Sequence, residues 1–278
     1  MTKKISTYLR RISAGFAVVG SAIAFYVTSL GSFSEPKLPN INLTQGQNQT
    51  KTQAPKTSTN FSQCRQFFAN GTPPALPTAP LQRELCFEAF AILHSGSTKT
   101  PIFVAQRLTR QSIQDAKGQK RTNRFFSDAR LPQAERAELS DYKNSKLSKG
   151  HMAPAGDMPD ATAMAQSFSL ANMVPQNQKQ NSGSWSKIER DTRNYVMRAQ
   201  GDVFVITGPF FGPNSISIGA NRVRVPTHIF KLVYDAKTQK AWAHWQENTG
   251  DARAGPPISY SELSGRIGMD LLPGIALR

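Results

Sequence analysis

Short apolar blocks separated by Gly, Pro and Asn fill much of the second half of the chain. Three of them, at 202–211, 215–235 and 240–248, predict strands, and the GANRV segment inside the second block predicts a turn between paired strands. Two earlier blocks, at 84–95 and 101–109, have the same character and are separated by a Gly-Ser-Thr-Lys turn. The pattern therefore predicts a sheet of strands joined by turns.

Helical spacing of apolar residues is found in fewer places. The segment 183–200 is the strongest case, and the residues that share this spacing are Trp185, Ile188, Thr192, Tyr195 and Ala199. Shorter helices are predicted at 131–139 and 259–268. Together these elements predict an α+β fold with a central, mainly antiparallel sheet and flanking helices. The sequence contains no internal repeat, P-loop, dinucleotide-binding fingerprint or coiled-coil heptads.

The first thirty residues have a different pattern, in which basic residues precede an apolar run of about 18 uncharged positions. The basic residues are Lys3, Lys4, Arg10 and Arg11. This pattern predicts a signal anchor or transmembrane helix over 1–30, with its cationic flank in the cytoplasm. The remainder would then lie outside the cytoplasm, in the periplasm of a bacterium and anchored to its inner membrane. Cleavage within the run, around Ser21–Ala24, would instead give a secreted protein.

Residues 31–61 are rich in Gln, Asn, Thr, Ser, Pro and Lys and show no apolar periodicity. Such a segment buries too little apolar surface to offset the entropy of ordering, so we expect a disordered linker there. The globular domain is then predicted to span 62–278.

Charge and cysteine content limit the classes of binding partner and the cellular compartments to be considered. The chain has 34 Lys and Arg against 18 Asp and Glu, a formal net charge of +16. This excess favours a polyanionic partner, either nucleic acid or an anionic membrane surface. Cys64 and Cys86 lack the close spacing of a zinc site. They would form one disulfide in an exported domain, and two buried thiols are the alternative.

A basic segment over 107–124 precedes two adjacent phenylalanines, Phe125 and Phe126. Its cations are Arg107, Arg110, Lys117, Lys120, Arg121 and Arg124. Cations bind phosphates and aromatic faces stack on exposed bases, so this segment is a candidate for binding nucleic acid. A merely solvated, charged face is the alternative.

Candidate chemistry is concentrated between residues 141 and 190. His151 follows Gly150 among small and polar residues, and a histidine serves as a general base because its pKa lies near neutral pH. Asn181 precedes the predicted helix and Glu189 lies within it. Amide and carboxylate oxygens suit magnesium, which keeps most of its own water. Taken alone, a lone histidine is more often structural.

The segments GHMAPAGDM, NMVPQ and NxGxWxxxE, taken together, resemble the DNA/RNA non-specific endonuclease family, whose site is the ββα-metal or His-Me finger motif. The resemblance covers about residues 62–260. It implies an endonuclease that needs magnesium, or manganese in its place. The implied substrates are DNA and RNA, cleaved to products with 5′-phosphates. If the protein stayed in the cytoplasm it would also need a cognate inhibitor, because a non-specific nuclease there would attack the host genome.

The resemblance also implies roles for individual residues. His151 would be the general base, Asn181 the direct metal ligand, and Glu189 the residue that orders metal-bound water. Arg124 would contact phosphate, with Arg121 as the next candidate. The residues expected to bind substrate are Arg107, Arg110, Lys120, Arg121, Asn172 and Gln176.

One feature departs from the family pattern, which commonly has Asp-Arg before Gly-His. Here the pair is Ser148-Lys149. Lys149 keeps the positive charge for a catalytic contact with phosphate but loses the bidentate geometry of arginine. A catalytically weakened, nucleic-acid-binding relative of the same fold is therefore the alternative function.

Overall fold

The computed structural model describes residues 60–278. The predicted anchor and most of the predicted linker lie outside these residues. Among the helices within 60–278, none is both long enough and apolar enough to cross a membrane. Phe61, which the sequence placed at the end of the linker, is buried and packs against the core, so the folded domain already includes it.

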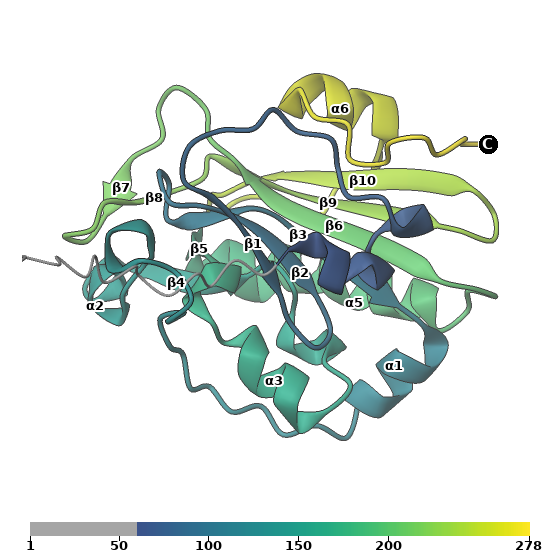
Figure 1. Ribbon diagram of the computed structural model, residues 1–278, viewed down its shortest axis with the longest axis horizontal. Coiled ribbons are helices and arrows are strands. Elements are labelled where there is room, and N and C mark those ends of the chain that lie inside the picture. The colour runs from purple at the N-terminus through teal and green to yellow at the C-terminus, as the bar shows by residue number, and fades with distance from the viewer. Residues whose placement is uncertain (1–59) are drawn as a thin grey trace, which may run out of the picture. The chain divides into compact units, whose positions relative to one another are not determined.

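A seven-stranded antiparallel sheet forms the centre of the domain, in the order β1-β2-β3-β6-β9-β10-β11 (Figure 1). The strands are β1 (Gln82–Cys86), β2 (Ala91–Ser95), β3 (Thr100–Leu108), β6 (Val203–Phe210), β9 (His228–Asp235), β10 (Lys240–Glu247) and β11 (Ile258–Ser259). Every adjacent pair is antiparallel. The predicted α+β class with a central antiparallel sheet is confirmed.

Side chains alternate between the two faces of this sheet, as the strand period requires. Phe230 and Leu232 of β9 pack with Leu263 of α6 (Tyr260–Ile267) on one face. Ile229, on the opposite face, packs with Trp185 and with α5 (Ser186–Val196). Each face is thus covered by one of the two longest helices of the described chain.

The remaining elements lie around the α5 face and at one end of the sheet (Figure 1). β4 (Leu147–His151) and β5 (Met173–Asn177) form an antiparallel pair, as do the short strands β7 (Ser217–Ile218) and β8 (Val223–Arg224). The other helices are α1 (Arg110–Ala116), α2 (Leu139–Tyr142), α3 (Ala161–Ser167) and α4 (Gln178–Gln180).

Two predicted helices differ from the structure. The 131–139 segment contains only a 3-10 turn at Gln133–Glu135, because Pro132 precedes it and Glu135 is bound by Arg83 from β1. The helix expected over 183–200 begins earlier, at Gln178–Gln180, passes through a π-helical turn at Asn181–Trp185 and continues as α5 to Val196. A contact with a residue far away in the sequence accompanies each difference, through Arg83 in the first and Gln246 in the second.

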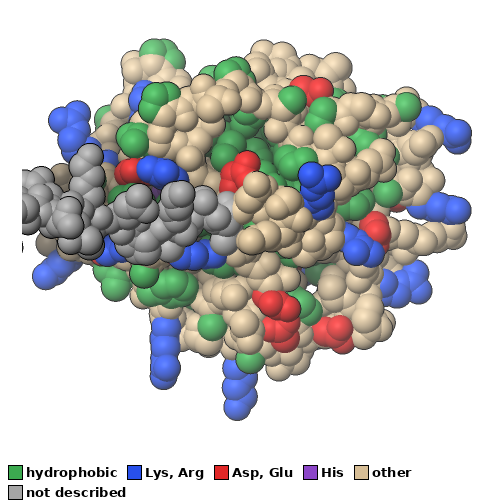
Figure 2. Space-filling view, viewed as in Figure 1, with side chains coloured by type: hydrophobic (Ala, Val, Ile, Leu, Met, Phe, Trp, Pro, Cys, Tyr) green, Lys and Arg blue, Asp and Glu red, His purple; other side chains and the backbone are tan. Residues whose placement is uncertain are grey.

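Lys and Arg side chains are spread around the rim of the face shown in Figure 2 and do not gather into a single patch. On this face the positive charge is therefore distributed. A binding surface must be located from cavities and side-chain partners, since the charge alone does not identify one.

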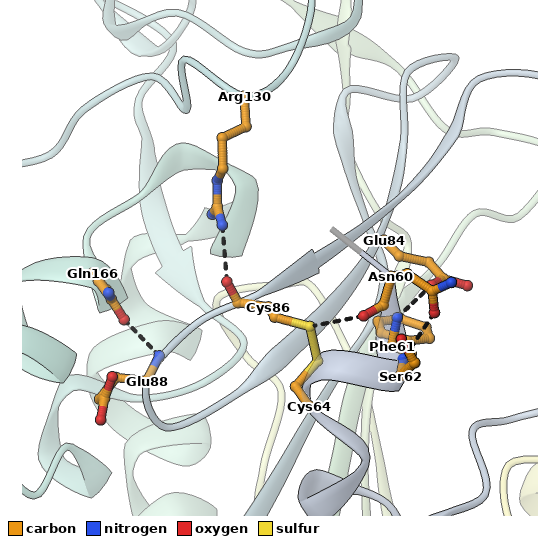
Figure 3. The surroundings of a disulfide bond; sticks show 9 residues. All are labelled: Asn60, Phe61, Ser62, Cys64, Glu84, Cys86, Glu88, Arg130 and Gln166. Carbon is orange, nitrogen blue, oxygen red and sulfur yellow. Dashed lines mark hydrogen bonds between the residues drawn. A yellow bond between two sulfur atoms is a disulfide. The ribbon is translucent and has the colours of Figure 1, made fainter. Parts of the chain in front are cut away.

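Cys64 and Cys86 form a disulfide, as predicted for an exported domain (Figure 3). The bond joins the turns at the start of the domain to the end of β1, across 22 positions of sequence. In the chain-entropy model, closing a loop of this size stabilises the fold by about 3 kcal/mol. Nearby, the backbone N–H of Phe61 donates to Glu84 Oε2 at 2.6 Å, which fixes the same entry segment to β1.

The buried side chain of His94, in β2, makes the stability of the fold depend on pH. The ring is fully buried, with Nε2 2.8 Å from the backbone oxygen of Glu135, and burial lowers the pKa of His94 to about 4. The charges of Asp128 and Glu135 oppose this shift, and that of Lys99 adds to it.

We expect the fold to lose stability as the pH falls from 6.5 towards 4, because the unfolded chain then binds a proton that buried His94 does not. The cost reaches about 2 to 3 kcal/mol near pH 4.5. Urea unfolding at pH 7 and pH 4.5 measures it. His94→Gln should lose about that much less stability across this interval than wild type, and an equal loss in both proteins would contradict the assignment.

Candidate active site

A cavity of about 410 Å³ lies between the end of β4, the loop after it, the π-helical turn and α5. Four of the predicted functional residues line it together, namely Arg121, His151, Asn181 and Glu189. The other lining residues are Pro154, Ala155, Gly156, Ser182, Ser186 and Arg193. Residue 121 and the segments 151–156 and 181–193 thus converge on one polar site.

His151 ends β4 and is 7% exposed. Its ring lies edge-on against Phe168 at 5.0 Å and contacts Phe125 at 5.8 Å. The Nε2 atom is buried and has no hydrogen-bond partner among the described residues. Desolvation, with a smaller effect of the Arg121 charge, lowers the pKa of His151 to about 3. The imidazole is therefore neutral at physiological pH and able to accept a proton.

Gly150 precedes His151 because no side chain fits there. A Cβ at this position would lie 1.8 Å from the side-chain oxygen of Gln176, which packs across the glycine from β5. Gln176 is fully buried and does not line the cavity, in contrast to the substrate contact expected from the sequence. Gln176 therefore positions β4.

Asn172 is also fully buried and holds the chain just beyond His151. Its Oδ1 accepts from the backbone N–H of Ala153, and its Nδ2 donates to the backbone oxygens of Ala153 and Ser167, all at 2.9 Å. With these bonds made, the amide is turned away from solvent. In the structure Asn172 therefore positions the chain after His151, and it does not make the direct contact with substrate that we expected.

A chain of buried amides fixes the turn that carries Asn181. Gln176 Nε2 donates to Gln180 Oε1, and Gln180 Nε2 donates to Gln246 Oε1, both at 2.5 Å. Ser184, inside the π-helical turn, donates to the same Gln246 oxygen at 3.1 Å. The turn is therefore joined to β5 and β10, and Asn181 is held on the cavity wall.

Glu189 is half-buried on the first turn of α5 above a set of buried charges. Desolvation raises the pKa of Glu189 to about 7, against an opposing effect of Lys231. Lys231, on the α5 face of β9, is 1% exposed and donates from Nζ to Thr207 Oγ1 at 2.8 Å. Desolvation lowers the pKa of Lys231, while the Glu189 and Asp157 charges raise it. Glu189 thus faces both the cavity and a buried cation.

Arg193 is a cavity residue that the sequence reasoning missed. Its Nη1 lies 3.0 Å from Oδ1 of buried Asp157, and Gly156 leaves room for the guanidinium, since a Cβ there would approach it to 3.1 Å. Arg193 follows Glu189 by four positions on one helix, so both lie on the same face. That spacing was visible in the sequence and could have identified it.

Of the cations that were expected to contact phosphate, the structure places some at the cavity and others away from it. Arg121 lines the cavity and lies over the Phe168 ring at 5.2 Å, whereas Arg124 is exposed and does not line it. Lys149 lies over the rings of Phe125 and Tyr142, at 4.8 and 5.6 Å, and does not line the cavity either. Of these three, Arg121 is the one placed to reach a bound phosphate directly.

The rest of the basic segment lies elsewhere. Arg107 pairs with Asp202 at 2.8 Å, and Asp202 lines a separate cavity together with Arg110. Lys120 is exposed on the loop that leads to Arg121. Any contact these three residues make with nucleic acid would be outside the His151 cavity.

The oxygen donors of the cavity suit a magnesium ion. Asn181 offers an amide oxygen and Glu189 a carboxylate, and magnesium is usually held by one or two such groups with several waters retained. Residues 60–278 contain no group of three or more His, Cys, Asp and Glu that could hold a metal. A metal here would rely on Asn181 and water, with Glu189 binding through water.

A family model for the DNA/RNA non-specific endonucleases matches residues 69–260, more than half of the chain. The chain belongs to this family. The family assignment made from the His151, Asn181 and Glu189 segments is confirmed. Metal dependence is typical of this family.

Curated relatives extend the comparison. Mitochondrial nuclease EXOG of Xenopus laevis is 35% identical over 154 residues, covering 51% of this chain and 42% of the relative. Human mitochondrial endonuclease G is 29% identical over 157 residues, 52% of each chain. The chain spans less than half the length of the EXOG relatives. The crystal structure of the EndoG/EndoGI complex shares the fold, with a TM-score of 0.65, 23% identity and coverage of 73% of this chain and 89% of that one.

Arg121 and Arg124 form a matched pair for testing this geometry. We expect Arg121→Ala to lower kcat on plasmid DNA by about 100-fold, since it removes one preorganised charge from the phosphate site. Arg124→Ala removes the same charge three residues away and should change kcat less than about threefold. Steady-state cleavage by the two folded variants measures the difference, and equal losses would place Arg124 at the site as well.

Proposed function

We propose that this nuclease is a magnesium-dependent endonuclease that hydrolyses phosphodiester bonds of DNA and RNA without regard to sugar or sequence, and that manganese can replace magnesium. The observation that carries the proposal is the convergence of His151, Asn181 and Glu189 on one cavity, with two arginines beside them. Such a site offers charge and a proton acceptor to a phosphate, and phosphates carry no sequence information.

In this proposal His151 removes a proton from a water molecule as that water attacks phosphorus. Burial keeps the imidazole neutral until substrate binds, and the negative charge of a bound phosphodiester then raises the pKa of His151. Arg121 and Arg193 hold the non-bridging oxygens. A magnesium ion bound at Asn181 would supply further positive charge to the phosphate. The bond from phosphorus to the 3′ oxygen breaks, that oxygen takes a proton from solvent, and the phosphate stays on the 5′ end.

The test is digestion of plasmid DNA and of RNA by the full chain, with magnesium and with excess EDTA. We expect both substrates to be degraded with magnesium and neither with EDTA. The products should accept label from polynucleotide kinase only after phosphatase treatment, because their 5′ ends carry phosphate. Retention of DNA on a gel without nicking, in magnesium or manganese, would decide for the catalytically weakened binding protein.

The location outside the cytoplasm and the anchor at 1–30 belong to the same proposal. The basic flank of the apolar run supports the anchor, and the Cys64–Cys86 disulfide favours an oxidising compartment. A nuclease held back in the cytoplasm would need an inhibitor, which is the proposed further partner. A reporter fused after Arg278 should be active only outside the cytoplasm, and cytoplasmic reporter activity would contradict this location.

A further inference from the structure

A second polar cavity, of about 420 Å³, lies beside the β7–β8 hairpin and the turn between β2 and β3. Its lining residues are Ser97, Lys99, Ser215, Ser217, Asn221, Arg222 and Arg224. Three of these carry positive charge and none carries negative charge. The site just described does not include any of them.

The cations of this cavity are not neutralised by ion pairs. Among the described residues, no salt bridge involves Lys99, Arg222 or Arg224. The Lys99 ammonium donates to the backbone oxygen of Gly96 at 3.5 Å, the outer limit for such a bond. The charge of all three side chains therefore remains available to an anion.

Two buried polar atoms at the cavity also lack partners. Nε of Arg224 and the hydroxyl of Ser215 are both buried without a hydrogen bond in the described structure. The Arg224 guanidinium lies over the Phe211 ring at 5.4 Å, which fixes its plane. Leaving a buried charged donor unsatisfied is costly, so this arrangement favours a ligand rich in acceptor oxygens.

Two carboxylates close to the hairpin and the turn already have hydrogen-bond partners. Asp141, behind the hairpin, accepts from the backbone N–H of Asn221 at 3.0 Å, from its side-chain amide at 2.9 Å and from the backbone N–H of Glu138 at 2.8 Å. Glu135, whose charge acts on Lys99, is bound by Arg83 at 2.8 and 2.9 Å. A local excess of positive charge therefore remains.

The hairpin is joined to the active site through a small apolar cluster. Val223, between the two arginines, points inward and packs in one cluster with Met173, the register partner of His151. Asn248 adds polar links, since it accepts from the backbone N–H of Asn177 at 2.7 Å and donates to the backbone oxygen of Pro226 at 2.9 Å.

From these observations we infer that the Lys99–Arg222–Arg224 cavity is a second phosphate-binding site, which holds the nucleic-acid backbone at a place separate from the bond being cleaved. This inference rests on the proposed function. The site contributes to the binding of long substrates and makes no contact with the reacting phosphate. It should therefore raise affinity for long chains and leave the turnover of short ones unaffected.

The test compares two double variants of the full chain, each lacking two positive charges. Arg222→Gln/Arg224→Gln removes charge from the cavity. Lys237→Gln/Lys240→Gln removes it from exposed positions at the β9–β10 turn, which does not line this cavity. Affinity for a duplex of about 30 base pairs is measured across a salt series. Both double variants also carry His151→Ala, so that cleavage of the duplex does not interfere with the binding measurement.

We expect the cavity variant to bind this duplex about tenfold more weakly near 0.1 M salt, with a salt slope reduced by about one to two. The turn variant should change affinity less than twofold. In the active background, the cavity variant should raise KM for the duplex and leave the cleavage of a trinucleotide unchanged.

Two outcomes would overturn the inference. Equal loss of affinity in both double variants would show a general effect of charge. Unchanged duplex affinity, with lost binding to vesicles that contain phosphatidylserine, would assign the cavity to a lipid surface. Absence of cleavage by the wild-type protein would count against the proposed function alone, because the binding comparison would still report on the second site.

Discussion

Replacing His151 with alanine should lower the rate of plasmid cleavage by about a thousandfold, within the range usual for loss of a general base. The reason is geometric, because His151 is the proton acceptor that shares the cavity with Asn181 and Glu189. Initial rates at saturating DNA measure the loss. Because His151 is buried against Phe125 and Phe168, circular dichroism and thermal unfolding must show that the variant is folded.

A matched control and a second readout separate chemistry from packing. His244 of β10 is half-buried and does not line the cavity, so His244→Ala should change the rate less than twofold. His151→Gln keeps much of the side-chain volume without the base and should be as inactive as His151→Ala. Added imidazole should partly restore cleavage only in the alanine variant. Full activity in a folded His151→Ala protein would remove the assigned mechanism.

The strands were predictable because they depend on local patterns, and the three main site residues were proposed because their segments resemble a known family. Strand residues alternate or form apolar blocks over short distances, and these gave the positions of β3, β6 and β9. The reason for Gly150 is visible only in the structure, since a glycine there allows Gln176 to cross β4 closely. The family resemblance pointed to Asn181 and Glu189, and the structure places both at the cavity.

Buried polar residues were harder to interpret from the sequence. Asn172 and Gln176 have the side chains expected of ligands, and the sequence does not show which way they face. Their amides instead form hydrogen bonds inside the protein. The Asn172 amide bonds to Ala153 and Ser167, and the Gln176 amide bonds to Gln180. A buried amide must find partners within the fold, and those partners are set by tertiary packing.

The choice between Arg121 and Arg124 could not be made from periodicity, because both lie in a loop without regular structure. The position of Arg121 depends on its contact with Phe168, 47 positions later. The π-helical turn before α5 similarly depends on Gln246, which belongs to β10. Each of these features requires a contact between distant segments.

Replacing Asn181 with alanine should lower activity by about a hundredfold or more and raise the magnesium concentration needed for half-maximal rate. In the proposed mechanism Asn181 is the direct metal ligand, and it lines the cavity with an amide oxygen to offer. Glu189→Gln should have a smaller effect, of about tenfold, because Glu189 acts through bound water. Magnesium titrations of the cleavage rate measure both, and manganese binding measured by calorimetry reports the metal without activity.

Ser182, next in the chain and on the same cavity wall, supplies the control for Asn181. Its hydroxyl donates to the backbone oxygen of Gln178 at 2.9 Å, so Ser182→Ala should leave the magnesium dependence unchanged. Asn181→Asp keeps an oxygen at the same place and should retain more metal binding than Asn181→Ala. If Asn181→Ala bound manganese and responded to magnesium as wild type does, the metal ligand would have to be another residue. Asp157 would then be a poor substitute, because its carboxylate is buried and paired with Arg193.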